Sequence, residues 1–307
     1  MISTKQNHLE FSKNEGRTKQ NLLFDESPFI YSLKKEDFCV DDRFYSDGYT
    51  LQGNINSYKE ALSFLERFIA NINTDKLPLY SRFLPRIQLA KVDKIPVCQS
   101  LIKTTFQALH FDMGQPIISE SSQTMYLIIA LYCTTSAESL VAKTRVVSLK
   151  KLLSQKKYGD KEFIEKNLID YVKKYGDGWT SPDVVNTLRI SCFARILDAV
   201  SGLNKLTDQT DKTTGEWFLY EDADNDLIGL EREYEFYRKC GFDLEKAEEQ
   251  ILLKPGELLI IDNMRAVHGR IGKRRPEEIY QFMFGVKSAQ HEDIDLFRNY
   301  LVDELAC

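Results

Sequence analysis

Histidine is scarce in this chain of 307 residues, which contains only His8, His110, His268 and His291. Long apolar runs are missing as well. A membrane-spanning helix needs roughly 18 consecutive apolar residues, and the longest candidate, residues 125–133, has only the length of a strand. We therefore expect no membrane span and no membrane partner.

An excess of basic residues and closely paired cysteines are also absent. The formal net charge is -5, unlike the basic footprint of a nucleic-acid-binding protein, so no nucleic-acid partner is expected. The six cysteines form no CxxC pair, which argues against a zinc knuckle or a dithiol motif. They fit best as free thiols in a reducing cytoplasm. The polar first 25 residues have no apolar core of a secretory signal, which agrees with a cytoplasmic location.

The chain has enough apolar material, 43% of its residues, to bury a substantial core. Residues 1–25 are polar and predict a peripheral or flexible N-terminal segment. Residues 26–307 contain no internal repeat and no convincing linker, so they predict a single domain. The sequence does not indicate the oligomeric state.

Local patterns predict a β core with flanking helices. One amphipathic helix begins at Ser57, which has capping-box spacing to Glu60. Two further helices are predicted over residues 162–174 and 294–305. Strand-like runs predict strands over residues 124–133 and 142–147, and two more, over residues 258–262 and 279–286, follow turn signals.

Two of the four histidines have neighbours that could bind a metal. If residues 107–112, QALHFD, form a strand, His110 and Asp112 point to the same face, because side chains alternate with period two. His268 beside them would complete a facial triad of two histidines and one carboxylate, whose open positions suit non-haem Fe(II). The His-x-Asp pair alone is a weak signal, since a surface histidine that bonds a neighbouring aspartate gives the same pattern.

The segment around His268 is far more specific. Residues 254–270 read KPGELLIIDNMRAVHGR, which resembles the distal-histidine segment of the clavaminate synthase-like oxygenases in the taurine dioxygenase superfamily. The resemblance covers about residues 101–286. It implies that His110, Asp112 and His268 are the metal ligands. It also implies a β-rich α+β fold with a double-stranded β-helix (jelly-roll, cupin-like) core, flanking helices and a helical lid insertion over about residues 160–250.

The same resemblance implies an Fe(II)/2-oxoglutarate-dependent dioxygenase that consumes O2 and oxidises a small molecule. Related iron halogenases have a small residue at the position of Asp112, so an intact carboxylate there favours hydroxylation or a similar oxidation. Thr144 matches a position whose hydroxyl assists 2-oxoglutarate binding in the family. An ordinary strand threonine is the alternative.

One family feature is missing from its usual place. Family members clamp the distal carboxylate of 2-oxoglutarate with an arginine about a dozen residues after the distal histidine, but residues 279–286 contain no arginine. The candidates Arg270, Arg274 and Arg275 precede this strand, in what reads as a shortened loop, and Arg275 is the first choice because it is nearest. Either the clamp has moved, or the iron works without 2-oxoglutarate. A non-catalytic iron-binding relative is a further alternative.

The substrate side is indicated only by an acidic run in the predicted insertion. Glu221, Asp222, Asp224 and Asp226 follow one another closely, and acidic lid residues in the family can hold a basic amino acid. Asp222 and Asp224 are therefore candidate substrate-binding residues for a free, basic amino acid. A solvated acidic turn explains the same run.

Overall fold

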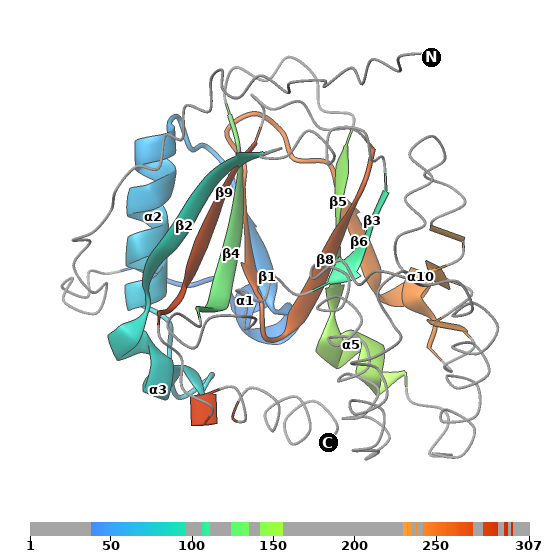
Figure 1. Cartoon of the computed structure of the whole chain (residues 1–307), viewed down its shortest axis with the longest axis horizontal. Coiled ribbons are helices and arrows are strands. Elements are labelled where there is room, and N and C mark those ends of the chain that lie inside the picture. The colour runs from blue at the N-terminus through green and yellow to red at the C-terminus, as the bar shows by residue number, and fades with distance from the viewer. Residues whose placement is uncertain are drawn as a thin grey trace, which may run out of the picture.

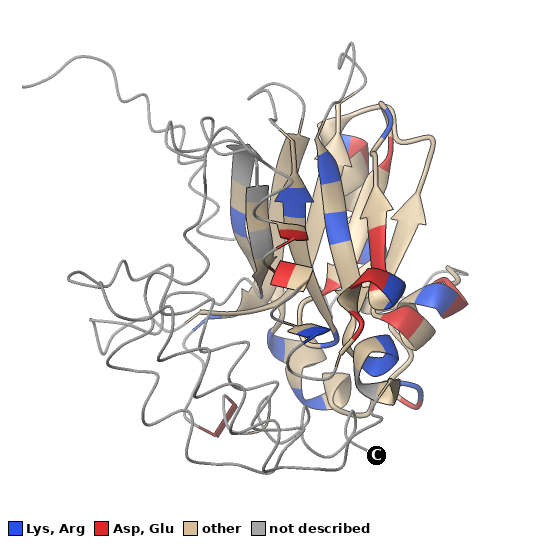
Figure 2. Cartoon of the chain, turned by 90° about the vertical axis from the view of Figure 1, so that its right-hand side faces the viewer, with Lys and Arg blue, Asp and Glu red and all other residues tan. Residues whose placement is uncertain are grey.

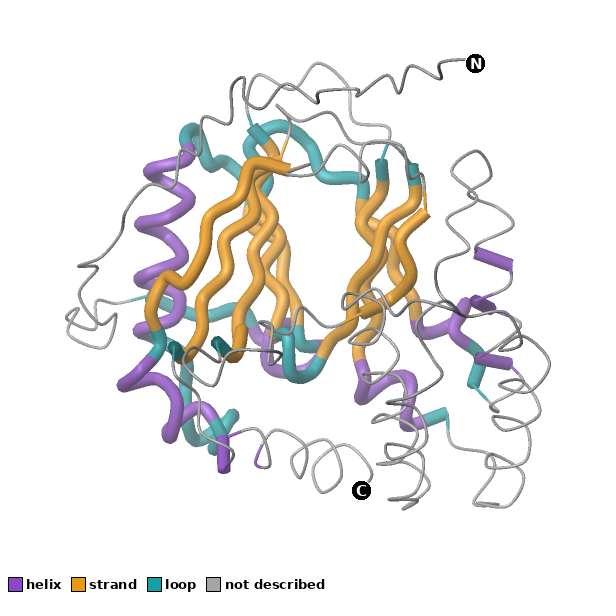
Figure 3. The backbone as a smooth tube through the Cα atoms, in the orientation of Figure 1, coloured by secondary structure: helices purple, strands orange, loops and turns teal. Residues whose placement is uncertain are grey.

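The computed structural model describes residues 38–95, 106–110, 124–134, 142–155, 242–272 and 279–287, with 230–231, 233–234, 237–238, 292–293 and 296. Two antiparallel sheets face each other in this part of the chain (Figures 1 and 3). The predicted β-rich α+β class is confirmed. The predicted N-terminal segment and the predicted helices over residues 162–174 and 294–305 lie outside the described residues, apart from residue 296.

The major sheet has five strands in the order β1-β7-β4-β9-β2, and the minor sheet has four in the order β3-β8-β5-β6. The major strands are β1 (Tyr49–Gln52), β7 (Leu258–Asp262), β4 (Met125–Cys133), β9 (Ile279–Val286) and β2 (Gln88–Ile95). The minor strands are β3 (Phe106–His110), β8 (Ala266–Ile271), β5 (Lys143–Ser148) and β6 (Glu248–Ile251). All four predicted strands are present within one residue of their expected bounds. β6 belongs to the minor sheet, and most of the lid insertion predicted over about residues 160–250 lies outside the described residues.

Short helices surround the sheets. They are α1 (Asp42–Asp47), α2 (Tyr58–Ala70), α3 (Tyr80–Phe83), a 3-10 turn η2 (Leu84–Arg86), α5 (Leu149–Ser154) and α10 (Leu244–Ala247). The prediction of a helix at Ser57 is confirmed: the Ser57 side chain accepts a hydrogen bond of 3.2 Å from the Glu60 N–H and so caps α2. None of the described helices has the length and apolar character that a membrane crossing requires.

Two layers of apolar side chains account for the arrangement. The outer face of the major sheet packs against α2 and buries residues such as Ile128, Ala130, Ile260, Phe282 and Phe284. A second cluster fills the space between the sheets. Its members include Ile129, Leu131, Leu259, Ile261 and Met283 from the major sheet, and Val146, Ile251 and Ala266 from the minor sheet. Because β4 and β7 are buried on both faces, their sequences are continuous apolar runs, which makes these strands predictable.

Glycine is needed at two places in this core. A Cβ on Gly285 would lie 2.2 Å from the Met125 carbonyl oxygen, so β9 can approach β4 there only without a side chain. Gly256 has a φ of +81°, and the Glu257 N–H bonds the Lys254 carbonyl at 3.0 Å. The turn predicted from Lys254, Pro255 and Gly256 is therefore confirmed, and it leads directly into β7.

Candidate metal centre

The two predicted histidine ligands occupy opposite positions in the minor sheet. His110 ends β3, and its direct partner across the antiparallel ladder is His268 on β8. Residues opposed in this way have Cα atoms about 4.5–5.5 Å apart, close enough for two imidazoles to reach one metal ion. The side chain of His268 is buried, with 5% of its surface exposed. Residues that are 158 positions apart in the sequence (268 − 110) are thus neighbours in the fold.

Thr144 and Arg270 lie on the same face of the minor sheet as His268. Val146 pairs with His268 and Thr144 pairs with Arg270, and opposed residues share a face. Val146 and Ala266 belong to the cluster between the sheets, so this is the inner face. Both candidates are buried, at 1% and 3% exposed. The prediction that Arg270 lies in a loop is wrong, because β8 is paired on both sides, with β3 and with β5.

The D-N-x-R part of the motif, residues 262–265, forms the turn that connects β7 to β8. The Asp262 carboxylate accepts hydrogen bonds from the Met264 N–H at 2.9 Å and from the Arg265 Nε at 2.6 Å. The Arg265 guanidinium then donates to the carbonyls of Phe44 and Tyr45 in α1. Asn263 bonds the backbone of β4 through both its N–H and its side-chain amide. The turn between β7 and β8 is therefore fixed to a helix and to the major sheet, and its last residue, Arg265, lies three positions before His268.

The outer face of the minor sheet carries a buried charge cluster that the sequence patterns do not reveal. Arg145 on β5 is fully buried, and its guanidinium pairs with the carboxylates of Glu233 and Glu248. Glu233 also accepts a hydrogen bond of 2.8 Å from the backbone N–H of Leu109, the residue before His110. The sequence shows Arg145 next to the apolar residues Val146 and Val147, but it does not show which distant residues pair with it.

Electrostatics hold this cluster together. Burial alone lowers the pKa of Arg145, but the nearby carboxylates of Glu233 and Glu248 outweigh it, so the pKa of Arg145 is raised. Burial raises the pKa of Glu233 above its usual value, and Arg145 and the Leu109 N–H offset only part of that rise. Tyr234 donates to Glu248 at 3.2 Å; burial and this carboxylate raise the pKa of Tyr234 to about 12.

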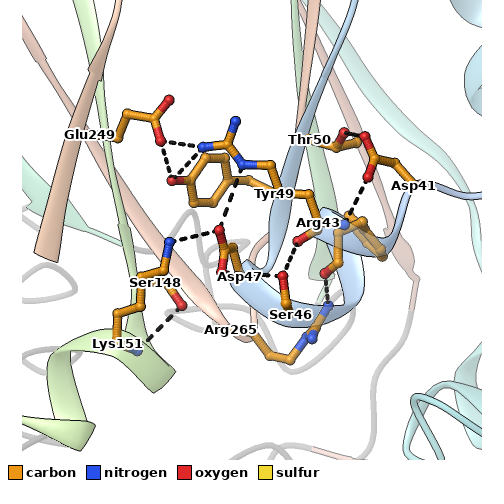
Figure 4. A network of polar contacts seen from close by, with 11 residues as sticks. Asp41, Arg43, Ser46, Asp47, Tyr49, Thr50, Ser148, Lys151, Glu249 and Arg265 are labelled. Carbon is orange, nitrogen blue, oxygen red and sulfur yellow. Dashed lines mark hydrogen bonds and ion pairs between the residues drawn. The ribbon is translucent and has the colours of Figure 1, made fainter.

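A second polar group joins the sheets at their other edges. Tyr49 on β1 donates a hydrogen bond of 2.7 Å to Glu249 on β6, and Arg43 binds both side chains (Figure 4). Asp47, beside them, pairs with Lys151 of α5 at 2.7 Å. Burial, followed by the hydrogen bond to Glu249, raises the pKa of Tyr49. The group ties β1 to β6, on the edge away from β3.

Several predicted site residues, namely Asp112, Arg274, Arg275, Asp222 and Asp224, lie outside the described residues. Within the described part, no three histidine, cysteine, aspartate or glutamate side chains gather into a metal site. The donor set itself fits iron: two imidazoles at opposed ladder positions and a carboxylate two residues beyond His110 are the ligand types of a non-haem Fe(II) site.

No protein-family model matches the chain, and no curated protein matches its sequence. Solved structures do match it. An asparagine oxygenase (AsnO) is 13% identical with a TM-score of 0.38, and the match covers 80% of this chain and 76% of that one. A taurine dioxygenase from Burkholderia xenovorans is 8% identical with a TM-score of 0.33, covering 79% and 77%. The non-haem iron oxygenase OrfP, in complex with Fe, succinate and (3S)-hydroxy-L-Arg, is 12% identical with a TM-score of 0.33, covering 83% and 81%.

The chain is similar to these solved structures at low identity and low TM-score. By their descriptions they are oxygenases, and OrfP was crystallised with iron and a hydroxylated arginine. Identities and TM-scores this low do not assign a site. The assignment therefore depends on the chain's own residues.

Proposed function

We propose that the chain is a non-haem Fe(II)/2-oxoglutarate-dependent dioxygenase that hydroxylates a small molecule, with His110, Asp112 and His268 as iron ligands. The observation that carries this proposal is the register of the minor sheet. Two of only four histidines in the chain, the same two that the sequence motifs single out, pair directly across the β3–β8 ladder. Asp112 follows His110 by one strand period, which favours the same side of the strand if β3 continues.

Arg270 and Thr144 are the proposed binding residues for the distal carboxylate of 2-oxoglutarate. Arg270 is two residues beyond His268 on the same face, roughly 6.6 Å along the strand, a separation suited to a short diacid bound to the metal at one end. A guanidinium grips a carboxylate bidentately, and the Thr144 hydroxyl beside it can donate a further bond. Arg275 remains the competing clamp.

The double-stranded β-helix core is part of the same proposal. Two facing antiparallel sheets with a polar inner patch on one of them support it. With Fe(II), 2-oxoglutarate and O2 bound, the centre would supply the oxidising chemistry, in which one oxygen atom enters succinate, released with CO2, and the other enters the substrate. The chain's own part is to hold the diacid, orient the substrate and exclude water through the apolar cluster between the sheets.

For the substrate we propose a free amino acid, with the helical insertion as a lid and Asp222 and Asp224 as contacts to a basic side chain. The support is the carboxylate run in the sequence, which a bound cation would relieve of charge repulsion. A hydrogen bond to a charged group contributes about 1.5–3 kcal/mol when water is excluded. Asp222→Asn or Asp224→Asn should therefore raise the KM for a basic substrate and leave iron binding unchanged.

The direct test combines anaerobic binding with turnover. Fe(II) and 2-oxoglutarate added under argon should give a weak visible charge-transfer band, and a panel of free amino acids with O2 should release succinate. If Fe(II) binds but no band appears and succinate never forms, an iron oxygenase that does not use 2-oxoglutarate replaces this proposal. If iron binds and no substrate is oxidised under any reductant, a non-catalytic iron-binding relative replaces it. Turnover of acidic or neutral amino acids alone contradicts the basic-substrate assignment.

A further inference from the structure

The strand that carries His110 is weakly held by its own sheet. Among the described strands, β3 lies at the edge of its sheet and pairs with β8 alone, and a bulge interrupts the ladder immediately before His110. Gln107 pairs with Arg270 and His110 with His268, so Ala108 and Leu109 together face the single residue Gly269. An extra residue of this kind locally disrupts ladder hydrogen bonds and bends the strand. The backbone next to a proposed metal ligand therefore needs support from elsewhere.

That support is a buried carboxylate on the outer face. The backbone N–H of Leu109, inside the bulge, donates to Oε1 of Glu233 at 2.8 Å. The other oxygen of Glu233 pairs with the guanidinium of Arg145. Both the carboxylate and the guanidinium are shielded from water, at 2% and 0% exposed, so the interaction is little screened. Figure 2, which views the molecule from the minor-sheet side, shows charged residues of both signs on the described strands and helices.

Arg145 is placed to span from the centre of the sheet to its edge. In the strand order β3-β8-β5, Arg145 and Leu109 are separated by β8. The ladder partner of Arg145 on β8 is Gly269, which has no side chain. At this register, then, no side chain of β8 projects between the guanidinium and β3. In the H-G-R motif, His268 and Arg270 are on the inner face. Gly269 between them has no side chain on the outer face, which leaves room there for Arg145 and Glu233 to connect β5 with β3.

We propose that Glu233, held by Arg145, is a positioning residue that fixes the bulged backbone of β3 and so sets the position of the metal ligand His110. The inference rests on the proposed function, because it concerns the same metal centre. It differs from a stabilising role: buried ion pairs are poor sources of net stability, whereas one carboxylate that joins a central strand to a ligand-bearing edge strand determines geometry. Outer partners of this kind typically change metal affinity about 10- to 100-fold when they are removed.

Glu248 provides a matched control. Its carboxylate is as buried as that of Glu233, at 1% exposed, and it pairs with the same guanidinium. Its other bonds go to Tyr234 and Gln250, and no described hydrogen bond joins it to β3. Glu233→Ala and Glu248→Ala both remove one carboxylate from Arg145, but only the first also removes the acceptor at Leu109. Glu233→Gln keeps an acceptor oxygen and loses the charge, so it serves as the conservative variant.

The experiment measures two quantities on the full chain. Fe(II) affinity is determined anaerobically by competition with a coloured chelator. Amide hydrogen exchange of the peptide containing residues 106–110 is measured without metal and compared with a peptide of β7. We expect Glu233→Ala to weaken Fe(II) binding about 10- to 100-fold and to accelerate exchange in β3 but not in β7. Glu233→Gln should retain part of the Fe(II) affinity and part of the protection of β3 from exchange. Glu248→Ala should lower Tm by the loss of its ion pair, but it should change neither the Fe(II) affinity nor the exchange in β3.

Equal losses of Fe(II) affinity in the Glu233 and Glu248 variants would overturn the inference, because the effect would then follow the ion pair and not the contact with Leu109. Unchanged exchange in residues 106–110 of Glu233→Ala would overturn it as well. If Glu233→Ala does not fold, Glu233→Gln decides between the same outcomes. A wild-type chain that binds no Fe(II) contradicts the proposed function itself, and the exchange data still decide whether Glu233 fixes β3.

Discussion

The inner face of the major sheet buries apolar side chains such as Ile129, Leu131 and Ile261, whereas the inner face of the minor sheet buries Thr144, His268 and Arg270 beside Val146 and Ala266. Both faces border the same space. The five-stranded sheet supplies the area removed from water that stabilises the fold. The four-stranded sheet places polar groups in that apolar enclosure, where an unscreened hydrogen bond or metal bond is strong.

The comparison indicates a division of roles between two sheets built from the same kind of strand. Substitutions on the major inner face should change stability and leave the chemistry intact. Substitutions on the minor inner face should change binding and leave most of the fold intact.

The largest effect is expected for His268→Ala, which removes a proposed ligand on β8. Fe(II) affinity should fall at least about 100-fold and succinate formation should stop, because the ion loses one of its three proposed protein ligands. Anaerobic Fe(II) titration and circular dichroism measure the binding and the retained fold. His291→Ala is the control, because His291 lies in a polar stretch of the sequence and should bind Fe(II) as wild type does. Turnover by His268→Ala at the wild-type rate would remove His268 from the centre.

The next effect lies on the opposite face. Ile129→Ala, at a fully buried position of β4, should lower the free energy of unfolding by about 2–5 kcal/mol, because it leaves a cavity between the sheets. Urea unfolding measures this loss. The Fe(II) affinity of the folded protein should not change. Leu51→Ala, at a 38% exposed position of β1, is the matched control and should stay within about 0.5 kcal/mol of wild type. A large loss of Fe(II) affinity in Ile129→Ala would break the proposed separation.

A smaller, more selective effect is expected for Arg270→Ala. Loss of a charge-assisted bond of about 1.5–3 kcal/mol should weaken 2-oxoglutarate binding about 10- to 100-fold while Fe(II) still binds. The intensity of the charge-transfer band against 2-oxoglutarate concentration gives the affinity. Arg274→Ala should behave like wild type, and Thr144→Val should lose less than Arg270→Ala. If Arg275→Ala loses the binding and Arg270→Ala does not, the clamp lies after β8.

The smallest effect concerns pH and two tyrosines: Tyr49 on β1 of the major sheet, and Tyr234, which donates to Glu248 of the minor sheet. The folded pKa of Tyr49 is raised, and that of Tyr234 is raised to about 12, whereas an unfolded tyrosine titrates near about 10. A tyrosine whose pKa is raised on folding contributes its full stabilisation at a pH below the pKa of the unfolded chain. This contribution is lost as the pH rises through the pKa of the folded protein. The free energy of unfolding should therefore fall from about pH 10 upward, as urea unfolding at each pH would show. The decline should be shallower in Tyr49→Phe and in Tyr234→Phe, and an identical decline in both variants and wild type would contradict these shifts.

Much of the framework can be predicted from the sequence because its central strands are buried on both faces. Continuous apolar runs such as residues 125–133 and 258–262 indicate such strands directly. The sequence does not predict β1, β2 and β6. β1 and β6 have only four residues each, some of them exposed, and β2 is an edge strand with several charged residues, so none shows a clear period of apolar residues. Tertiary pairing, not local preference, makes them strands.

The site divides in the same way. The motif around His268 identifies the histidine pair that the ladder brings together, but the motif does not predict that Arg270 lies in β8 instead of a loop. Glu233 and Arg145 cannot be paired from the sequence, because 88 residues separate them and no local pattern relates them. The positions of Asp112, Asp222 and Asp224 stay predictions.

The order of strands along the chain has a consequence for biosynthesis. β8 is the only ladder partner of β3 among the described strands, and it is translated 158 residues later (268 − 110). At about 5–20 residues per second, roughly 8–30 s pass before that partner has left the ribosome. During this interval the backbone N–H and C=O groups of β3 have no partner strand, and an unpaired strand of this kind is prone to pair with other chains. Slower synthesis lengthens this interval, so soluble yield should depend on how well the cell protects the early strands until the last ones arrive.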